Sequence, residues 1–198
     1  EYTNVNWSVD ELVDKLSTRL GGVEGFTDLS KLYDQAYVVK VVAASKHPNA
    51  DKLTVCLVDD AGVVDGVERN NDGYVQVVCG APNVTEGMLA VWLPPGAVVP
   101  SSVASGDPFK LASRSLRGVV SRGMLASLAE MNLGDDHSGI IDITAEQVEL
   151  GASFVEVYGL DDVMIDVENK MFTHRPDCFG QIGIAREVAG IQHLPFES

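Results

Sequence analysis

His47-Pro48-Asn49-Ala50-Asp51-Lys52-Leu53 is a polar, turn-forming phrase between two apolar runs, and two phrases of similar character follow it along the chain. These are Val78-Cys79-Gly80-Ala81-Pro82-Asn83-Val84 and Ser121-Arg122-Gly123-Met124. Each phrase combines residues that favour turns with polar groups that could face a ligand. Because short alternating apolar runs separate the phrases, the pattern predicts strands joined by loops.

Five apolar, β-branched runs around these phrases predict strands. They are Val38–Ala44, Leu53–Asp59, Tyr74–Cys79, Leu89–Leu93 and Gly139–Ile143. Gly- and Pro-bearing connections lie between them, and the segment Pro94–Pro108 is predicted to be a long surface loop. Several short strands with such connections favour a small barrel or sandwich, since closure of the sheet removes exposed edges.

Helical spacing lies on both sides of the β-rich centre. Ser8, with a glutamate three residues later, is a capping-box pattern and predicts a helix over residues 9–20. A second amphipathic pattern covers residues 182–191. We expect Arg175 and Asp177 to fasten the start of that helix, with Asp177 as its N-cap.

The two helical flanks are too short to form independent cores. We therefore predict that residues 1–37 and 151–198 pack together as one discontinuous domain. Residues 38–150 are then a β-rich domain inserted between them.

The charge of the chain limits how it could bind nucleic acid. The formal net charge is −15, and residues 38–150 still carry 14 Asp or Glu against 8 Lys or Arg. Such a chain does not hold nucleic acid through bulk electrostatics, so any RNA binding must come from a local patch. No run approaches the roughly 20 apolar residues of a membrane-spanning helix, and we expect a cytoplasmic protein.

The sequence predicts neither a catalytic centre nor a metal site. The cysteines Cys56, Cys79 and Cys178 are widely spaced and odd in number, without a CxxC pair or clustered histidines. His137 follows two aspartates, but a turn explains it more simply than catalysis does. The glycine-rich stretches do not have the spacing of a phosphate-binding loop.

The two ends of the chain carry a more specific pattern. The opening has Asn6-Trp7-Ser8, and the closing part has Asn169-Lys170-Met171-Phe172-Thr173-His174-Arg175-Pro176-Asp177-Cys178, then Gly183-Ile184-Ala185-Arg186-Glu187. Together with the three central phrases, these stretches resemble the N-terminal region of the bacterial phenylalanyl-tRNA synthetase beta chain. The resemblance implies an α+β fold, in which a five-stranded, EMAP II-like OB-fold barrel is inserted into a small helix-containing domain made of both chain ends.

The resemblance also implies a function. The chain would be the N-terminal fragment of a longer beta chain, helping to bind tRNA and to scaffold the subunit. The intact enzyme is an alpha2-beta2 heterotetramer that attaches phenylalanine to tRNA with ATP and magnesium, and its catalytic centres lie elsewhere. We expect no cofactor in this fragment and neither DNA nor membrane as a partner. Two alternatives remain: a structural or protein-interaction domain without RNA affinity, and a free-standing EMAP II-like tRNA-binding module, although such modules lack both flanks.

Nine residues are candidates for RNA binding because they are basic or hydrogen-bonding groups in the three phrases or near them. They are Lys46, His47, Asn49, Lys52, Asn83, Arg114, Arg117, Ser121 and Arg122. Ordinary turn formation would also explain Asn49, and a solvated strand edge would explain the arginines. The stretch Asp60–Asn71 is longer and more acidic than the hairpin expected in the family, which weakens RNA binding by that edge.

Overall fold

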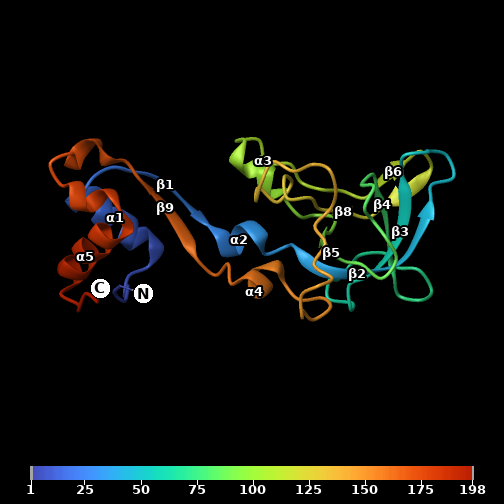
Figure 1. The fold of residues 1–198 in the computed structure, drawn as a ribbon, viewed down its shortest axis with the longest axis horizontal. Coiled ribbons are helices and arrows are strands. Elements are labelled where there is room, and N and C mark those ends of the chain that lie inside the picture. The colour runs from blue at the N-terminus through green and yellow to red at the C-terminus, as the bar shows by residue number, and fades with distance from the viewer. Residues whose placement is uncertain (1, 198) are drawn as a thin grey trace. The chain divides into compact units, whose positions relative to one another are not determined.

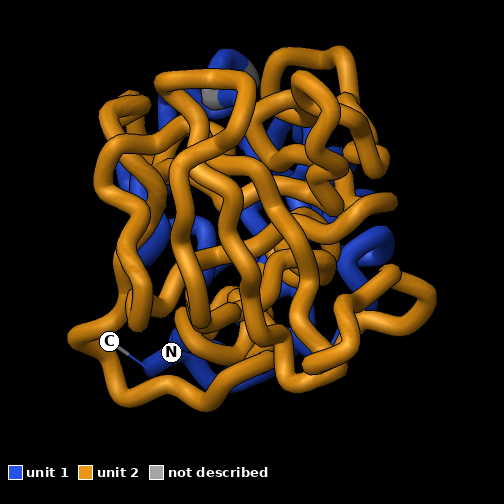
Figure 2. The backbone as a smooth tube through the Cα atoms, turned by 90° about the vertical axis from the view of Figure 1, so that its right-hand side faces the viewer, with its two compact units in different colours: residues 1–28, 163–198 blue, residues 29–162 orange. Residues whose placement is uncertain are grey.

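The computed structural model describes residues 2–197, which divide into two compact units (Figures 1 and 2). Unit 1 is formed by residues 1–28 and 163–198, and unit 2 by residues 29–162. The predicted limits of the inserted domain, residues 38 and 150, describe where the β-rich fold begins and ends, whereas the compact units are divided by contacts. The predicted limits therefore stay a prediction. No helix in the described part of the chain is long and apolar enough to cross a membrane.

Unit 2 is built on a five-stranded antiparallel sheet with the strand order β4-β3-β2-β5-β8. Its strands are β2 (Tyr37–Lys46), β3 (Thr54–Asp59), β4 (Val75–Cys79), β5 (Leu89–Leu93) and β8 (Met124–Leu125). The long strand β2 pairs with β5 through residues 37–40 and with β3 through residues 40–46, with a register shift between Val41 and Ala43. A bulge of this kind bends a strand and helps a sheet to curve into a barrel.

The sheet curls until β4 meets the segment just before β8. The Arg122 amide donates to the Gln76 carbonyl at 3.0 Å, and the Val78 amide donates to the Ser121 hydroxyl at 2.9 Å. The Gln76 side-chain amide donates to the Val120 carbonyl at 2.8 Å. We call this meeting of β4 with Val120–Arg122 the barrel seam. It confirms the predicted α+β class with a nearly closed five-stranded barrel of the OB type.

Alternating side chains of the strands fill the barrel. The core residues on β2, β3 and β4 are Val39, Val41, Cys56, Val58, Val75, Val77 and Cys79. Trp92 of β5 is also fully buried, and its indole N–H donates to the Arg122 carbonyl at 3.0 Å. Burial raises the pKa of the Cys56 thiol to about 12, so this cysteine acts as a small hydrophobic residue.

The strand predicted over Gly139–Ile143 is wrong, because the structure has only an isolated bridge there, between Ala90 and Asp142. The Ile141 and Ile143 amides donate to the carbonyls of Ala126 and Leu89, but side chains make the other bonds: Asn83 bonds both the amide and the carbonyl of Ile140, and the Thr144 hydroxyl accepts from the Leu89 amide. The fifth strand is instead the short β8, whose two residues are too few for an alternating pattern.

The prediction of an irregular surface loop over Pro94–Pro108 is also wrong. The segment contains the helix α3 (Pro100–Ala104), and its Ala97 and Val99 are buried in a second core cluster. Helices α2 (Leu29–Tyr33) and α4 (Phe154–Tyr158) supply Tyr33 and Phe154 to the same cluster. The first part of this segment therefore packs against the second core cluster. The chain then continues into the hairpin of β6 (Arg114–Leu116) and β7 (Val119–Ser121).

The acidic β3–β4 connection, residues 60–74, is also folded rather than loose. Asp60 is fully buried and accepts from the amides of Gly62 and Val64 and from the Arg69 guanidinium, whose closest nitrogen lies at 2.7 Å. Arg69 donates in turn to the carbonyls of Val64 and Val67. Because Val64 and Val67 also pack on the barrel core, the backbone of this connection is fixed at several points.

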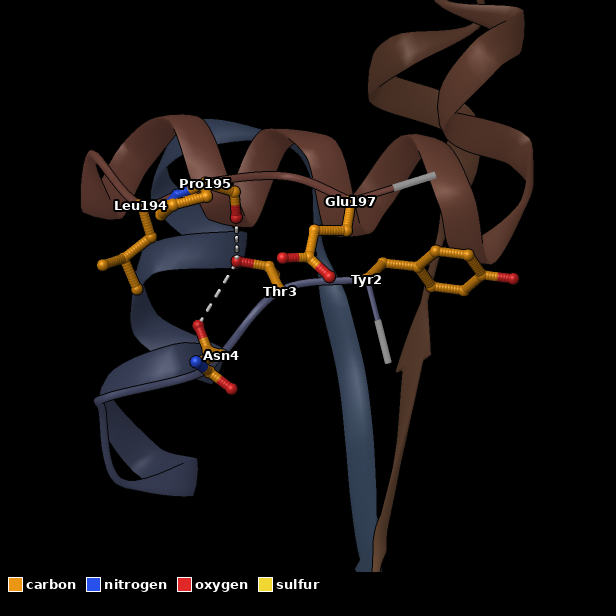
Figure 3. A pocket seen from close by; sticks show the side chains of 6 residues that line it. All are labelled: Tyr2, Thr3, Asn4, Leu194, Pro195 and Glu197. Carbon is orange, nitrogen blue, oxygen red and sulfur yellow. Dashed lines mark hydrogen bonds between the residues drawn. The ribbon is translucent and has the colours of Figure 1, made fainter.

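Unit 1 packs two helices with a two-stranded sheet. Its elements are α1 (Val9–Arg19), β1 (Val23–Asp28), β9 (Val163–Val167), η1 (Asn169–Phe172), η2 (Pro176–Phe179) and α5 (Gln181–Gln192). The predicted capping box is confirmed, since Ser8 and Glu11 exchange both of its hydrogen bonds. Thr3 donates to the Pro195 carbonyl, which links the two terminal segments beside a small hollow (Figure 3).

Asp177 does not cap α5, contrary to the expectation, because Gly180 takes the N-cap position. The guanidinium of Arg175 binds the carboxylates of Asp177 and Glu187 instead, at 2.8 and 2.5 Å. This pairing holds the turn of η2 against α5. It also lowers the pKa of Asp177 to about 2, chiefly through the hydrogen bond from Arg175.

The lowered pKa predicts acid sensitivity of unit 1. Because the folded-state pKa of Asp177 lies below its ordinary value of 3.8, its stabilising effect is present above pH 4 and is lost as the pH falls towards 2. Thermal unfolding followed between pH 5 and pH 2 should show this loss in the wild type and a weaker pH dependence in Asp177→Asn. Asp166→Asn, an exposed aspartate of the same unit, should behave as the wild type.

The buried ion pair of the β3–β4 connection predicts a large effect on stability. Asp60→Ala should lower the free energy of unfolding by about 3 kcal/mol, since it removes the partner of a mostly buried guanidinium. Urea unfolding measures this, with Asp65→Ala on the same connection as the control that stays near the wild type. Equal stability of the two variants would mean that the pair does not hold the connection.

Candidate nucleic-acid interface

The β2–β3 turn, residues 47–53, is held by His47, whose side chain is only 2% exposed. The Asn49 amide donates to its Nδ1 at 3.0 Å, so Nδ1 is unprotonated and the proton of the neutral ring lies on Nε2. Nε2 then donates to the Leu116 carbonyl at 3.0 Å. His47 therefore joins the turn to the β6–β7 hairpin and has no ring nitrogen free for RNA.

A second bond joins the same two segments. Asn49 Nδ2 donates to the Arg117 carbonyl at 3.0 Å. Arg117 and Gly118 form the tip of the hairpin with φ values of 47° and 93°, as a two-residue hairpin turn of the primed type requires. The turn and the hairpin tip are thus fixed side by side through backbone carbonyls, which leaves the Arg117 side chain exposed.

Four exposed cations lie on these joined segments, and we call them the basic face. They are Lys46, Lys52, Arg114 and Arg117. Lys52 and Arg117 line one hollow of about 640 Å³, and within residues 2–197 neither has a carboxylate partner. Lys46 pairs with Asp51 at 2.8 Å, but both side chains are so exposed that such a pair contributes little and opens easily.

Arg114 shares its surroundings with an aromatic ring. Its guanidinium carbon lies 5.4 Å from the centre of the Phe109 ring, within cation–π range. Phe109 is 44% exposed although its backbone is tied to Ser102 and Val99. A ring held in the open beside a cation can stack on a nucleobase. Phe109 is not among the residues predicted from the sequence, and only its position before the basic stretch could have indicated it.

The remaining candidates have structural bonds. Ser121 is buried, accepts from the Val78 amide and donates to the Gly123 carbonyl. Arg122 belongs to the barrel seam, and its guanidinium binds Glu68 at 2.6 Å. Asn83 uses both ends of its amide on Ile140. Direct RNA contact by His47, Asn49 and these three residues stays a prediction. The structure shows that His47 and Asn49 join the β2–β3 turn to the hairpin, that Ser121 and Arg122 belong to the barrel seam, and that Asn83 holds the backbone of Ile140.

Among the described residues, one group of possible metal ligands comes together, formed by Asp177, Cys178 and Glu187. Arg175 already binds both carboxylates. Burial is the main reason why the pKa of the Cys178 thiol is raised, and this disfavours the thiolate form that binds metals. The group therefore acts as an ion-pair cluster of unit 1.

Comparison with known proteins identifies the barrel. Residues 37–153, which run from the first residue of β2 to the N-cap residue of α4, match the family model described as a putative tRNA binding domain. The chain belongs to this tRNA-binding-domain family. The match covers every residue of the basic face.

Relatives extend the similarity beyond the barrel. The phenylalanine–tRNA ligase beta subunits of Nitrobacter winogradskyi and Rhodopseudomonas palustris are 39% and 40% identical to it over 189 residues. Each alignment covers 96% of this chain and 22% of the relative, so the chain spans about a fifth of their length and the match includes both flanks. The predicted resemblance to these beta subunits is confirmed. A solved MetRS-related protein from Pyrococcus horikoshii is more distant, with 20% identity and a TM-score of 0.41 over 64% of this chain and 95% of that one.

The barrel seam predicts a stability effect at Ser121. Ser121→Ala leaves the buried Val78 amide without an acceptor and should lower the free energy of unfolding by about 1–3 kcal/mol. Ser115→Ala, an exposed serine on the same hairpin, is the matched control and should change it by less than about 0.5 kcal/mol. A stable Ser121→Ala variant that has lost RNA affinity would instead mark Ser121 as a direct contact.

Proposed function

We propose that this chain is a tRNA-binding and scaffolding part of a phenylalanine–tRNA ligase beta subunit, which contacts tRNA through the basic face. One observation carries the proposal above all others: the family match coincides with the barrel on which the basic face is built. The similarity to phenylalanine–tRNA ligase beta subunits supports the assignment to that subunit.

Attraction of tRNA to this chain would come from local charge and not from the overall charge. The chain as a whole repels a polyanion at long range, since its formal net charge is −15. Lys52, Arg114 and Arg117 nevertheless project from a rigid base, and within the described part of the chain none of them binds a carboxylate, so they can meet phosphates without first breaking an ion pair. Phe109 adds a surface on which an unpaired base could stack.

For the intact enzyme we propose the activity and assembly that the resemblance to the beta-chain family implies. It would attach phenylalanine to tRNA with ATP and magnesium, as an alpha2-beta2 heterotetramer in the cytoplasm. This chain would supply no catalytic group. Its part would be to hold tRNA and to support the subunit.

A structural or protein-interaction domain without RNA affinity is the second candidate. It is favoured by the acidic balance of the chain and by the internal bonds of His47, Asn49, Asn83, Ser121 and Arg122. A free-standing tRNA-binding module is disfavoured, because the relatives match 96% of the chain and not the barrel alone.

A salt titration of tRNA binding tests the proposal. The wild type should bind tRNA with a Kd on the order of micromolar at low salt and lose affinity as salt rises. The triple variant Lys52→Gln, Arg114→Gln, Arg117→Gln should bind at least about 10-fold more weakly, with a salt slope smaller by about 2 to 3, because each lost phosphate contact removes about one unit.

The matched control removes three cations from unit 1 by Lys15→Gln, Arg19→Gln and Lys170→Gln. It makes the same change in net charge and should bind nearly as the wild type does. Absence of tRNA binding by the wild type at low salt would favour the scaffold function instead. Equal weakening by both triple variants would mean that net charge, and not the basic face, determines binding.

A further inference from the structure

The β6–β7 hairpin separates two hollows of the barrel surface. One is the hollow that Lys52 and Arg117 line. The other, of about 440 Å³, lies beside Gly118 and Val120 and includes Glu68, Gln76 and Arg122. The second hollow therefore continues the basic face past the hairpin tip.

Arg122 is the deepest cation at this surface. Its side chain is only 13% exposed, and its backbone is fixed on both sides by Gln76 and Trp92 in the barrel seam. The Glu68 carboxylate lies against the guanidinium at 2.6 Å and is itself 79% exposed. Glu68 thus lies between this guanidinium and the solvent.

The two partners differ in how firmly they are held. Glu68 stands next to Arg69, which the buried Asp60 anchors, so the backbone on either side of Glu68 stays in place. No second hydrogen bond holds the Glu68 side chain among the described residues, and water already solvates most of it. Its carboxylate can therefore rotate into solvent while the connection and Arg122 remain fixed.

We propose that this hollow is a phosphate site of the RNA-binding face, in which the Glu68 carboxylate stands in for the phosphate in the free protein. The inference rests on the proposed function. A phosphate and a carboxylate both accept paired hydrogen bonds from a guanidinium, so RNA that follows the hairpin from Arg117 reaches Arg122 by displacing Glu68. Binding is weaker than it would be with a free Arg122 guanidinium, because RNA must first release this internal anion.

The test compares two charge-neutralising variants of the same connection in the full 198-residue chain. Glu68→Gln removes the carboxylate at Arg122, whereas Asp65→Asn removes an exposed carboxylate three residues away. Both change the net charge by one unit, so the long-range repulsion of RNA falls equally. Only Glu68→Gln frees the Arg122 guanidinium before RNA arrives.

Binding of a bulk tRNA mixture is measured against salt concentration. Glu68→Gln should bind about 3- to 10-fold more tightly than Asp65→Asn, because the Arg122 guanidinium no longer has to release a carboxylate before it meets a phosphate. In an Arg122→Gln background, Glu68→Gln should give no gain beyond that of Asp65→Asn. Both single variants alter exposed side chains, so the result does not depend on the folding of the Arg122 variant.

Equal affinities of Glu68→Gln and Asp65→Asn for tRNA would overturn the phosphate site. If the wild type binds and the basic-face triple variant loses affinity in that same experiment, the failure belongs to this inference alone. If neither the wild type nor Glu68→Gln binds tRNA at low salt, the proposed function fails together with it.

Discussion

Closure of the barrel depends on the contact between β4 and the segment Val120–Arg122. A sheet of five strands that stops short of this contact would leave β4 as an open edge, with amides and carbonyls unpaired. The hydrogen bonds of Gln76, Val78 and Ser121 close that edge, and the Trp92 indole ties the same segment to β5. The hairpin and the β2–β3 turn are both positioned relative to this seam.

Closure of the barrel at this seam also requires a glycine at position 123. Its φ is 80°, and a Cβ atom there would lie 2.1 Å from the Leu93 carbonyl oxygen and 2.8 Å from the Trp92 indole nitrogen. Only a residue without a side chain lets the chain turn from the seam into β8 at this distance. The phrase Ser121-Arg122-Gly123-Met124 is thus explained first by the architecture, and any role in binding is built on it.

Local pattern was enough to predict much of the fold. The alternating apolar residues of β2 to β5 and the capping box at Ser8 are read within a few neighbouring residues. The wrong strand over 139–143 has a long-range cause, since the Asn83 side chain takes both backbone groups of Ile140 from 57 positions away. The candidate site shows the same limit: only the pairing of His47 with Leu116, 69 positions apart, shows that this histidine faces inward while Lys52 faces solvent.

The hairpin tip is held through its main chain, by His47 on the Leu116 carbonyl and Asn49 on the Arg117 carbonyl. These bonds do not depend on which side chains the tip carries. Substitutions at Arg114 or Arg117 can therefore raise, lower or abolish the charge of the surface without disturbing the barrel. In evolution, the RNA affinity of such a module can therefore increase, decrease or disappear, leaving a purely structural domain, while the fold stays the same.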